Sequence, residues 1–141
     1  MLGFFRSRKK SAPPRILVVD DEPDYVSTIQ CRLEWCHYKV ITAANGNEGL
    51  EKARSEKPDL ILLDTSMPVM DGHKMLDQLR RDPVLKDMPV IMVTALCEPD
   101  HIAKASSYGV VDYIAKPFDF NELLEKISAV LEKRMLTGSR D

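Results

Sequence analysis

Five polar side chains stand at or just after the apolar runs of this chain, where they could form one chemical site. They are Asp20, Asp21, Asp64, Thr94 and Lys116. Runs of large aliphatic residues such as residues 60–63 are typical of strands buried on both faces of a parallel sheet. Ligands of open parallel sheets bind outside the carboxyl ends of the strands. We therefore expect these five side chains to converge at one edge of a sheet.

Three carboxylates in one small volume repel each other unless positive charge relieves them. The ammonium group of Lys116 supplies one such charge, and a divalent cation would supply the rest. A small set of oxygen ligands open to solvent suits Mg²⁺, and Mn²⁺ could substitute. A carboxylate beside Mg²⁺, a hydroxyl and a lysine is suited to phosphoryl transfer onto an aspartate, with Asp64 as the attacking group.

Each of the five residues also has an ordinary structural explanation. Acids such as Asp20 and Asp21 favour the dipole of a following helix. Thr94 lies in a β-forming run, and an isolated lysine is usually a surface residue. The coincidence of all five at strand ends favours a site over these separate explanations. By contrast, His37, His73 and His101 show no ligand spacing and are predicted to lie on the surface.

Strands and helices are predicted to alternate along the chain. Strands are expected at residues 16–20, 38–43, 59–64, 89–94 and 110–114, and helices at 23–35, 45–55, 72–81, 98–109 and from 119 to about 133. Five such βα units predict an α/β fold with one doubly wound parallel sheet and right-handed crossovers. The second strand is more polar and is predicted at an edge. Gly49, inside the second helix, costs that helix roughly 1 kcal/mol relative to alanine.

Composition describes an ordinary globular domain of 141 residues with a formal net charge of −2. Five of the 20 lysines and arginines fall within residues 1–15, which hold no acid, so residues 16–141 carry 15 cations against 22 acids. This acidic body argues against direct nucleic-acid binding. We expect a basic, disordered tail over residues 1–14, a domain over 15–133 and a frayed tail over 134–141. A weak membrane anchor through Phe4 and Phe5 is the less favoured alternative for the first tail.

Cysteine spacing and hydropathy indicate the cellular compartment of the protein. The three cysteines form no C-x-x-C pair, so neither a disulfide framework nor a zinc site is implied. Cys36 is predicted to be a small core residue. No apolar run approaches the ~18 residues of a membrane span. The simplest interpretation is a reduced, cytoplasmic protein.

The chain resembles the response-regulator receiver domains of two-component signalling systems, from Arg15 to about Lys133. The motifs that carry the resemblance are Val18-Val19-Asp20-Asp21-Glu22, Leu62-Leu63-Asp64, Met67-Pro68, Asp71-Gly72, Val93-Thr94-Ala95 and Lys116-Pro117-Phe118. The resemblance implies a flavodoxin-like (βα)5 fold with strand order 2-1-3-4-5. It implies a phosphoryl group taken from a histidine kinase or a histidine phosphotransfer protein, and signalling to a downstream protein.

The resemblance also implies a role for each site residue. Asp64 would be the phosphoacceptor, and Asp21, Asp64 and the backbone carbonyl of Ser66 would ligate Mg²⁺, with Asp20 acting through water. Ser66, Ala95 and Lys116 would contact the phosphoryl group. The hydroxyl of Thr94 would swing onto the phosphoryl group, and Tyr113 would then move inward. This change would alter the face formed by the fourth helix, fifth strand and fifth helix. The Lys116-Pro117 peptide would be cis.

Three other functions compete with this interpretation. A pseudo-receiver would be a protein-interaction module that takes no phosphate, and the complete set of five residues argues against it. A phosphatase with an aspartate nucleophile would need a second acid two residues later, where Ser66 stands. A flavodoxin-like cofactor binder would need a phosphate loop at residues 20–23, where acids repel phosphate. We therefore expect that the protein is not an enzyme, and that its only reactions are Mg²⁺-dependent self-phosphorylation and slow autodephosphorylation.

Leu96, two residues after Thr94, is predicted to lengthen the life of the phosphorylated form. Its side chain has no polar group that could orient an attacking water. Leu96→Asn should therefore shorten the phosphorylated lifetime, measured as the decay of the phosphorylated mass after the phosphodonor is removed. An unchanged decay rate would contradict the idea.

Overall fold

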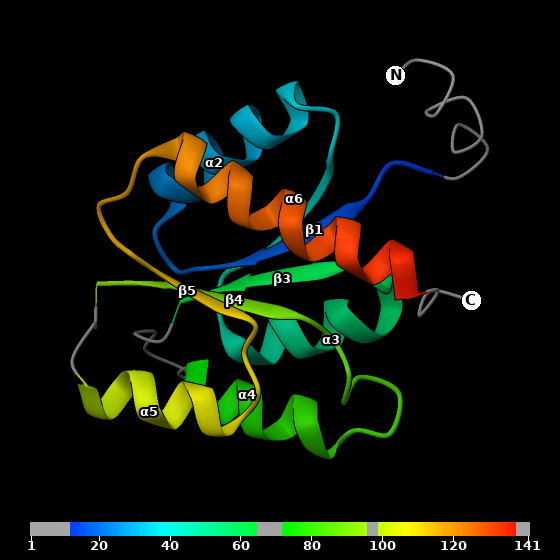
Figure 1. The fold of residues 1–141 in the computed structure, drawn as a ribbon, viewed down its shortest axis with the longest axis vertical. Coiled ribbons are helices and arrows are strands. Elements are labelled where there is room, and N and C mark those ends of the chain that lie inside the picture. The colour runs from blue at the N-terminus through cyan, green and yellow to red at the C-terminus, as the bar shows by residue number, and fades with distance from the viewer. Residues whose placement is uncertain (1–11, 65–71, 96–98, 138–141) are drawn as a thin grey trace.

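Five parallel strands form one sheet in the computed structural model, which describes residues 12–64, 72–95 and 99–137 (Figure 1). The strands are β1 (Arg15–Val19), β2 (Lys39–Ala43), β3 (Leu60–Leu63), β4 (Val90–Thr94) and β5 (Asp112–Ala115). The helices are α2 (Pro23–Trp35), α3 (Gly46–Glu56), α4 (Gly72–Arg81), α5 (Pro99–Ser107) and α6 (Phe120–Thr137). Strands and helices alternate as the sequence predicts.

The strand order is β2-β1-β3-β4-β5, and every neighbouring pair is parallel. This confirms the predicted fold and places the polar second strand at an edge. The order reverses direction at β1, whose neighbours are β2 on one side and β3 on the other. Val19, the last residue of β1, is in register with Leu63, the last residue of β3. The two strands therefore end side by side, so the residues directly after them start from neighbouring points.

Helices cover both faces of the sheet (Figure 1). Helices α2 and α6 pack on one face, and α3, α4 and α5 pack on the other. Alternate strand residues separate into the two cores: Leu17 and Val19 face α3 and α4, whereas Ile16 and Val18 face α2 and α6. This division arises from the period of two in a strand. Because both faces are covered, the strands are rigid supports for the side chains at their carboxyl ends.

Helical spacing within residues 72–81 predicts that Met75, Leu76 and Leu79 face inward, and helix α4 confirms this prediction. Met75, Leu76 and Leu79 are all fully buried in the core beneath the sheet. The first turn of the same helix corrects a prediction, because His73 is buried rather than on the surface. Its ring stacks on that of His101 from α5, with centroids 5.6 Å apart. The packing of α4 against α5 covers this position, which a pattern based on metal-ligand spacing cannot show.

Strand β5 begins two residues later than predicted. The β-branched pair Val110-Val111 matches a strand pattern, but the ladder with β4 starts at Asp112. Gly109 adopts a positive φ of 73°, and the two valines carry the chain from this turn to the sheet. Val111 already donates its N–H to the carbonyl of Val90 (2.9 Å), yet its side chain is half exposed. At the other end of the chain, α6 continues past the expected boundary at Lys133.

Gly49 lies where α3 makes a close contact with its neighbours. A Cβ at this position would stand 2.9 Å from Cε of Met75 and 3.1 Å from Cγ2 of Val19. The end of Met75 can move, but Val19 is fixed in a strand buried on both faces. The glycine therefore allows α3 to approach the sheet and α4 closely, which explains its presence in a helix.

Gly49→Ala should lower the free energy of unfolding by about 1 kcal/mol. Overpacking a core destabilises by roughly 1–3 kcal/mol, whereas the higher helix propensity of alanine stabilises by only about 1 kcal/mol. Chemical denaturation would measure the change. Ser55→Ala, at an exposed position of the same helix, is the control and should change stability by less than about 0.5 kcal/mol. A stabilising effect of Gly49→Ala would show that the contact is not tight.

Candidate functional site

Three carboxylates meet at the carboxyl edge of the sheet. One oxygen from each of Asp20, Asp21 and Asp64 lies within 4.8 Å of the other two. Asp20 and Asp64 are almost fully buried, with 3% and 6% of their surface exposed, whereas Asp21 is exposed. The cluster therefore has one side closed by protein and one side open to solvent. The structure brings together the acids that the sequence singled out.

Backbone hydrogen bonds fix the backbone positions of the two buried acids. The N–H of Asp20 donates to the carbonyl of Ala43 (3.1 Å), and the N–H of Asp64 donates to the carbonyl of Val19 (3.0 Å). Each bond extends a strand ladder by one step beyond the last strand residue. The side chains therefore leave the sheet from fixed neighbouring points, at the topological switch point beside β1.

Lys116, directly after β5, reaches this acidic cluster. Its Nζ donates to Oδ2 of Asp20 at 2.7 Å and to Oε1 of Glu22 at 3.2 Å, and lies 4.0 Å from Oδ2 of Asp64. The Lys116 side chain is largely buried and joins residues from opposite ends of the chain. The Lys116-Pro117 peptide is cis, as the resemblance implied.

The pKa of Lys116 reflects a balance of opposing effects. Burial lowers this pKa, but the hydrogen bond and charge of Asp20, the charge of Asp64 and the hydrogen bond to Glu22 outweigh it, so the pKa lies above its ordinary value. The lysine therefore remains an ammonium group at neutral pH. Its positive charge offsets part of the carboxylate repulsion.

Tyr25 on α2 belongs to the site, although the sequence reasoning did not identify it. The Nζ of Lys116 lies 4.2 Å from the centroid of the Tyr25 ring, a cation–π distance. Phe118 packs edge-on against this ring with centroids 6.2 Å apart. Burial, together with the charges of Asp20, Asp64 and Glu22, raises the pKa of Tyr25. The signal available in the sequence was its place in the first turn of the helix after Asp20-Asp21.

The predicted switch residues flank the same edge. Thr94 ends β4 and is fully buried, and its backbone carbonyl accepts a hydrogen bond from the N–H of Lys116 (3.0 Å). Ala95, predicted to contact phosphate, is exposed. Tyr113 lies on β5 in register with Met92 and is half-buried against the core shared with α5. Ser66 and Leu96 lie outside the described residues, as do Met67, Pro68 and Asp71.

The donor set suits a hard divalent cation. All three clustered groups offer carboxylate oxygens, and the cluster keeps one face open to water. Mg²⁺ takes oxygen ligands and retains several waters, so these residues match its requirements better than those of Zn²⁺. Both carboxylate oxygens of Asp20 already accept hydrogen bonds, Oδ1 from the N–H of Glu22 (3.0 Å) and Oδ2 from Lys116. Asp21 and Asp64 are therefore better suited to direct metal ligation.

The fold and this edge define a doubly wound α/β protein with an acidic site at its switch point. The family model of the response regulator receiver domain matches residues 16–128, and the chain belongs to this family. Among the described residues, every helix is too short or too polar to cross a membrane.

Curated relatives with this similarity are longer proteins. The alkaline phosphatase synthesis transcriptional regulatory protein PhoP of Bacillus subtilis is 41% identical over 119 residues, which is 84% of this chain and 49% of that protein. The DNA-binding dual master transcriptional regulator RpaA of Synechocystis is 38% identical over 120 residues, or 85% and 50% of the two chains. This chain therefore spans about half the length of these relatives.

Solved structures show the same fold over nearly their whole length. A CheY-like receiver domain protein of Methanospirillum hungatei superposes with a TM-score of 0.84 at 32% identity, covering 89% of this chain and 98% of that one. The chemotaxis protein CheY4 of Vibrio cholerae gives a TM-score of 0.80 at 31% identity, with coverages of 84% and 99%.

Asp64→Asn should raise the free energy of unfolding measured in EDTA by about 1–2 kcal/mol, because it removes one of three mutually repelling charges at nearly constant volume. The control is Glu51→Gln, an exposed acid on α3, which should change stability by less than about 0.5 kcal/mol. A loss of stability in Asp64→Asn would show that attraction to Lys116, and not repulsion among the acids, dominates the site.

Proposed function

We propose that the chain is a phosphorylation-activated receiver in which Asp64 accepts a phosphoryl group. The observation that carries this proposal is the meeting of Asp20, Asp21 and Asp64 with the ammonium group of Lys116 at the edge of the sheet. A structural ion pair would need one acid and one cation. Three acids beside a single buried lysine leave negative charge uncompensated, which suits a site that gains a cation and a phosphoryl group.

We assign Asp64 as the nucleophile because its backbone is fixed directly after β3, its side chain is almost fully buried, and Lys116 lies near it without the close hydrogen bond that it makes to Asp20. A carboxylate oxygen of Asp64 forms the new bond to phosphorus, while the bond from phosphorus to the donor breaks. Asp21, Asp64 and the carbonyl of Ser66 would hold Mg²⁺, with Asp20 acting through water, and the bound ion would supply charge that balances the phosphoryl oxygens. Lys116, now 4.0 Å from Asp64, pairs with the new phosphoryl group. Ser66 and Ala95 would provide further phosphate contacts.

Transfer to Asp64 would draw the hydroxyl of Thr94 toward the phosphoryl group. Thr94 has no exposed surface and ends the strand that borders β5. Its movement opens space near Tyr113, whose ring then moves inward. The face formed by α5, β5 and α6 would change shape, because Tyr113 lies on β5 and packs against the core that α5 shares. A downstream protein that recognises only the changed face would complete the signal.

The phosphodonor is a histidine kinase or a histidine phosphotransfer protein in the cytoplasm. The receiver part acts through protein contacts and not by binding DNA itself, since the acidic balance of residues 16–141 disfavours a phosphate backbone. The names of PhoP and RpaA describe transcriptional regulators, and the match to this chain covers about half of each. We assign the output step to a partner or to another part of such a regulator.

Incubation of the protein with acetyl phosphate and Mg²⁺ should add the mass of one phosphoryl group, as measured by intact mass spectrometry. Asp64→Asn should remain unmodified, and EDTA should abolish the modification of the natural protein. Lys116→Met should slow the reaction, because the developing charge loses its ammonium partner. An unmodified natural protein under these conditions would favour the pseudo-receiver, which takes no phosphate.

A further inference from the structure

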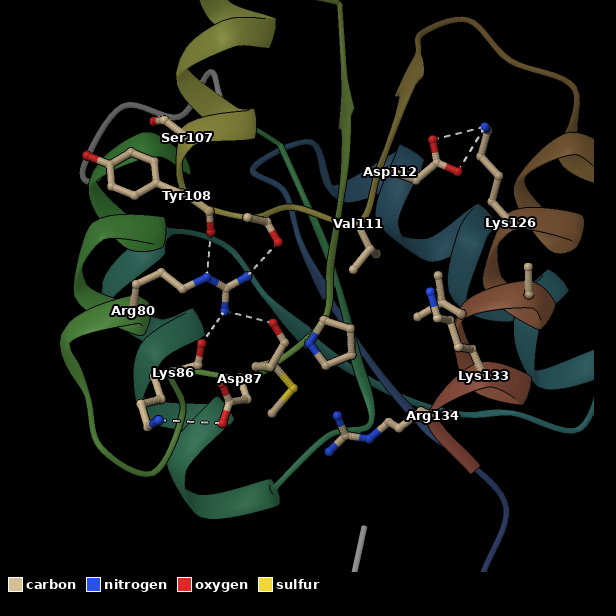
Figure 2. Close-up of a pocket in the computed structure, with 15 residues that line it drawn as sticks. Arg80, Lys86, Asp87, Ser107, Tyr108, Val111, Asp112, Lys126, Lys133 and Arg134 are labelled. Atoms are coloured by element: carbon tan, nitrogen blue, oxygen red, sulfur yellow. Dashed lines mark hydrogen bonds and ion pairs between the residues drawn. The ribbon is translucent and has the colours of Figure 1, made fainter. Parts of the chain in front are cut away.

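A cavity of about 780 Å³ lies at the end of the sheet opposite the acidic site, and Figure 2 shows the residues that line it. Pro89 immediately precedes β4 and Val111 immediately precedes β5, so the cavity opens at the amino ends of these strands. The C-terminal half of α6 forms another wall. The volume of the cavity falls within the range of about 300–1,000 Å³ typical of small-molecule pockets. None of the proposed phosphorylation residues lines it.

The wall of this cavity is held in place by Arg80. The guanidinium donates to the carbonyls of Tyr108 (2.6 Å), Met88 (2.8 Å), Lys86 (3.0 Å) and Gly109 (3.4 Å). These bonds tie the end of α4 to the loop before β4 and to the turn before β5 (Figure 2). Arg80 therefore preforms the pocket, which lowers the ordering cost of binding a ligand there.

The charge of the lining is strongly positive in a chain whose body is acidic. Its charged residues are the cations Arg80, Lys86, Lys126, Lys133 and Arg134 and the acids Asp87 and Asp112. Both oxygens of Asp112 accept from Lys126 at 3.1 Å, so this pair is balanced. Lys86 lies 3.8 Å from Asp87, a long ion-pair distance. The lining as a whole holds five cations and two acids, and Lys133 from α6 lies at its exposed rim.

The hydrogen bonds of Arg80 leave its charge in place, because the four backbone carbonyls that accept them are neutral. Burial lowers the pKa of Arg80, and the charge of Asp87 opposes that effect only in part. An anion near this guanidinium would be stabilised in turn. In Figure 2, Arg134 extends from α6 toward the side of the cavity on which Arg80 lies. Cations therefore border the cavity from two sides.

The lining also has an apolar part, which we call the floor of the cavity. It is formed by Met88, Pro89, Val111, Ala129 and Val130. A bare inorganic anion would leave this apolar surface in contact with water, whereas an uncharged hydrocarbon would gain nothing from the excess of cations over acids in the lining. An apolar ring that carries an acidic group satisfies both parts of the lining, because the ring covers the floor and the acid pairs with the rim.

We propose that this cavity binds a small organic anion, composed of a flat apolar ring system that carries a phosphate or a carboxylate. The site is separate from the phosphorylation site. The probes that match this chemistry are adenosine monophosphate for the phosphate form and 2-naphthoate for the carboxylate form. Adenosine and inorganic phosphate each supply only one half of the recognition.

The test is a titration of the full chain monitored by ¹H–¹⁵N correlation spectra in EDTA, which prevents metal-mediated binding at the acidic edge. At least one of the two amphiphilic probes should shift the amides of residues 107–112 and 129–134, and leave those of residues 20–22 unchanged. Adenosine and inorganic phosphate should bind at least roughly tenfold more weakly, since each lacks one part of the contact. Comparison of the two probes decides between the phosphate and the carboxylate.

Two variants check the cavity without disturbing the core. Lys133→Glu reverses an exposed rim charge and should weaken binding by roughly fivefold or more, whereas Lys39→Glu, on the far edge strand, should leave it unchanged. Ala129→Trp fills the cavity from the surface of α6 and should abolish binding, whereas Ala103→Trp, an exposed alanine of α5 outside the lining, should not.

Three results would overturn the proposal. The first is the absence of shifts with both amphiphilic probes. The second is binding that Lys133→Glu and Ala129→Trp leave intact, which would place the ligand elsewhere. The third is a set of the same shifts produced by raising the protein concentration alone, which would assign this surface to contact between copies of the chain.

Discussion

The mutual repulsion of three carboxylates at one edge of a sheet is the constraint on which this structure depends. Asp20 and Asp64 are buried there, and Asp21 stands beside them. Such an arrangement is costly unless the surrounding fold enforces it. The enforcing parts are the fully buried strands β1 and β3, whose paired ends bring the acids together, and Lys116, which carries positive charge in from β5.

The same constraint explains why the site contains more than the minimum set of residues. Lys116 is held by Asp20 and Glu22 and lies over the ring of Tyr25. Its position is therefore determined from three directions, while its distance from Asp64 remains longer than a direct hydrogen bond. The ammonium group thus stays close to the carboxylate of Asp64 at a distance longer than a hydrogen bond.

Sequence patterns predicted the parts of the fold that depend on periodicity. Buried aliphatic runs located the strands, and helical spacing predicted the inward face of α4, as Met75, Leu76 and Leu79 show. The acids and Lys116 were found because they stand at strand ends, which a parallel sheet gathers at one edge. These features are local in the sequence or result from topology.

Features that depend on packing between elements were missed. The contact of Tyr25 with Lys116 joins α2 to the chain after β5, and His73 is buried by the neighbouring α5. Neither contact leaves a periodic trace in the sequence. Val110-Val111 has a strand composition but serves to connect a turn to the sheet. The cavity beside Arg80 is likewise invisible in the sequence, because its four acceptors are backbone carbonyls.

The pairing of Asp20 with Lys116 has a consequence for synthesis of the protein. The two residues are 96 positions apart, so the partial charge compensation at this edge requires almost the whole domain. During translation the acids of β1 and β3 emerge first, and their ammonium partner emerges only with the last strand. If β1 and β3 pair before Lys116 has been synthesised, the acids are brought together without their ammonium partner, and contacts between distant segments form late in folding. Lys116 can therefore join the acidic edge only when the final βα segment of the domain has left the ribosome.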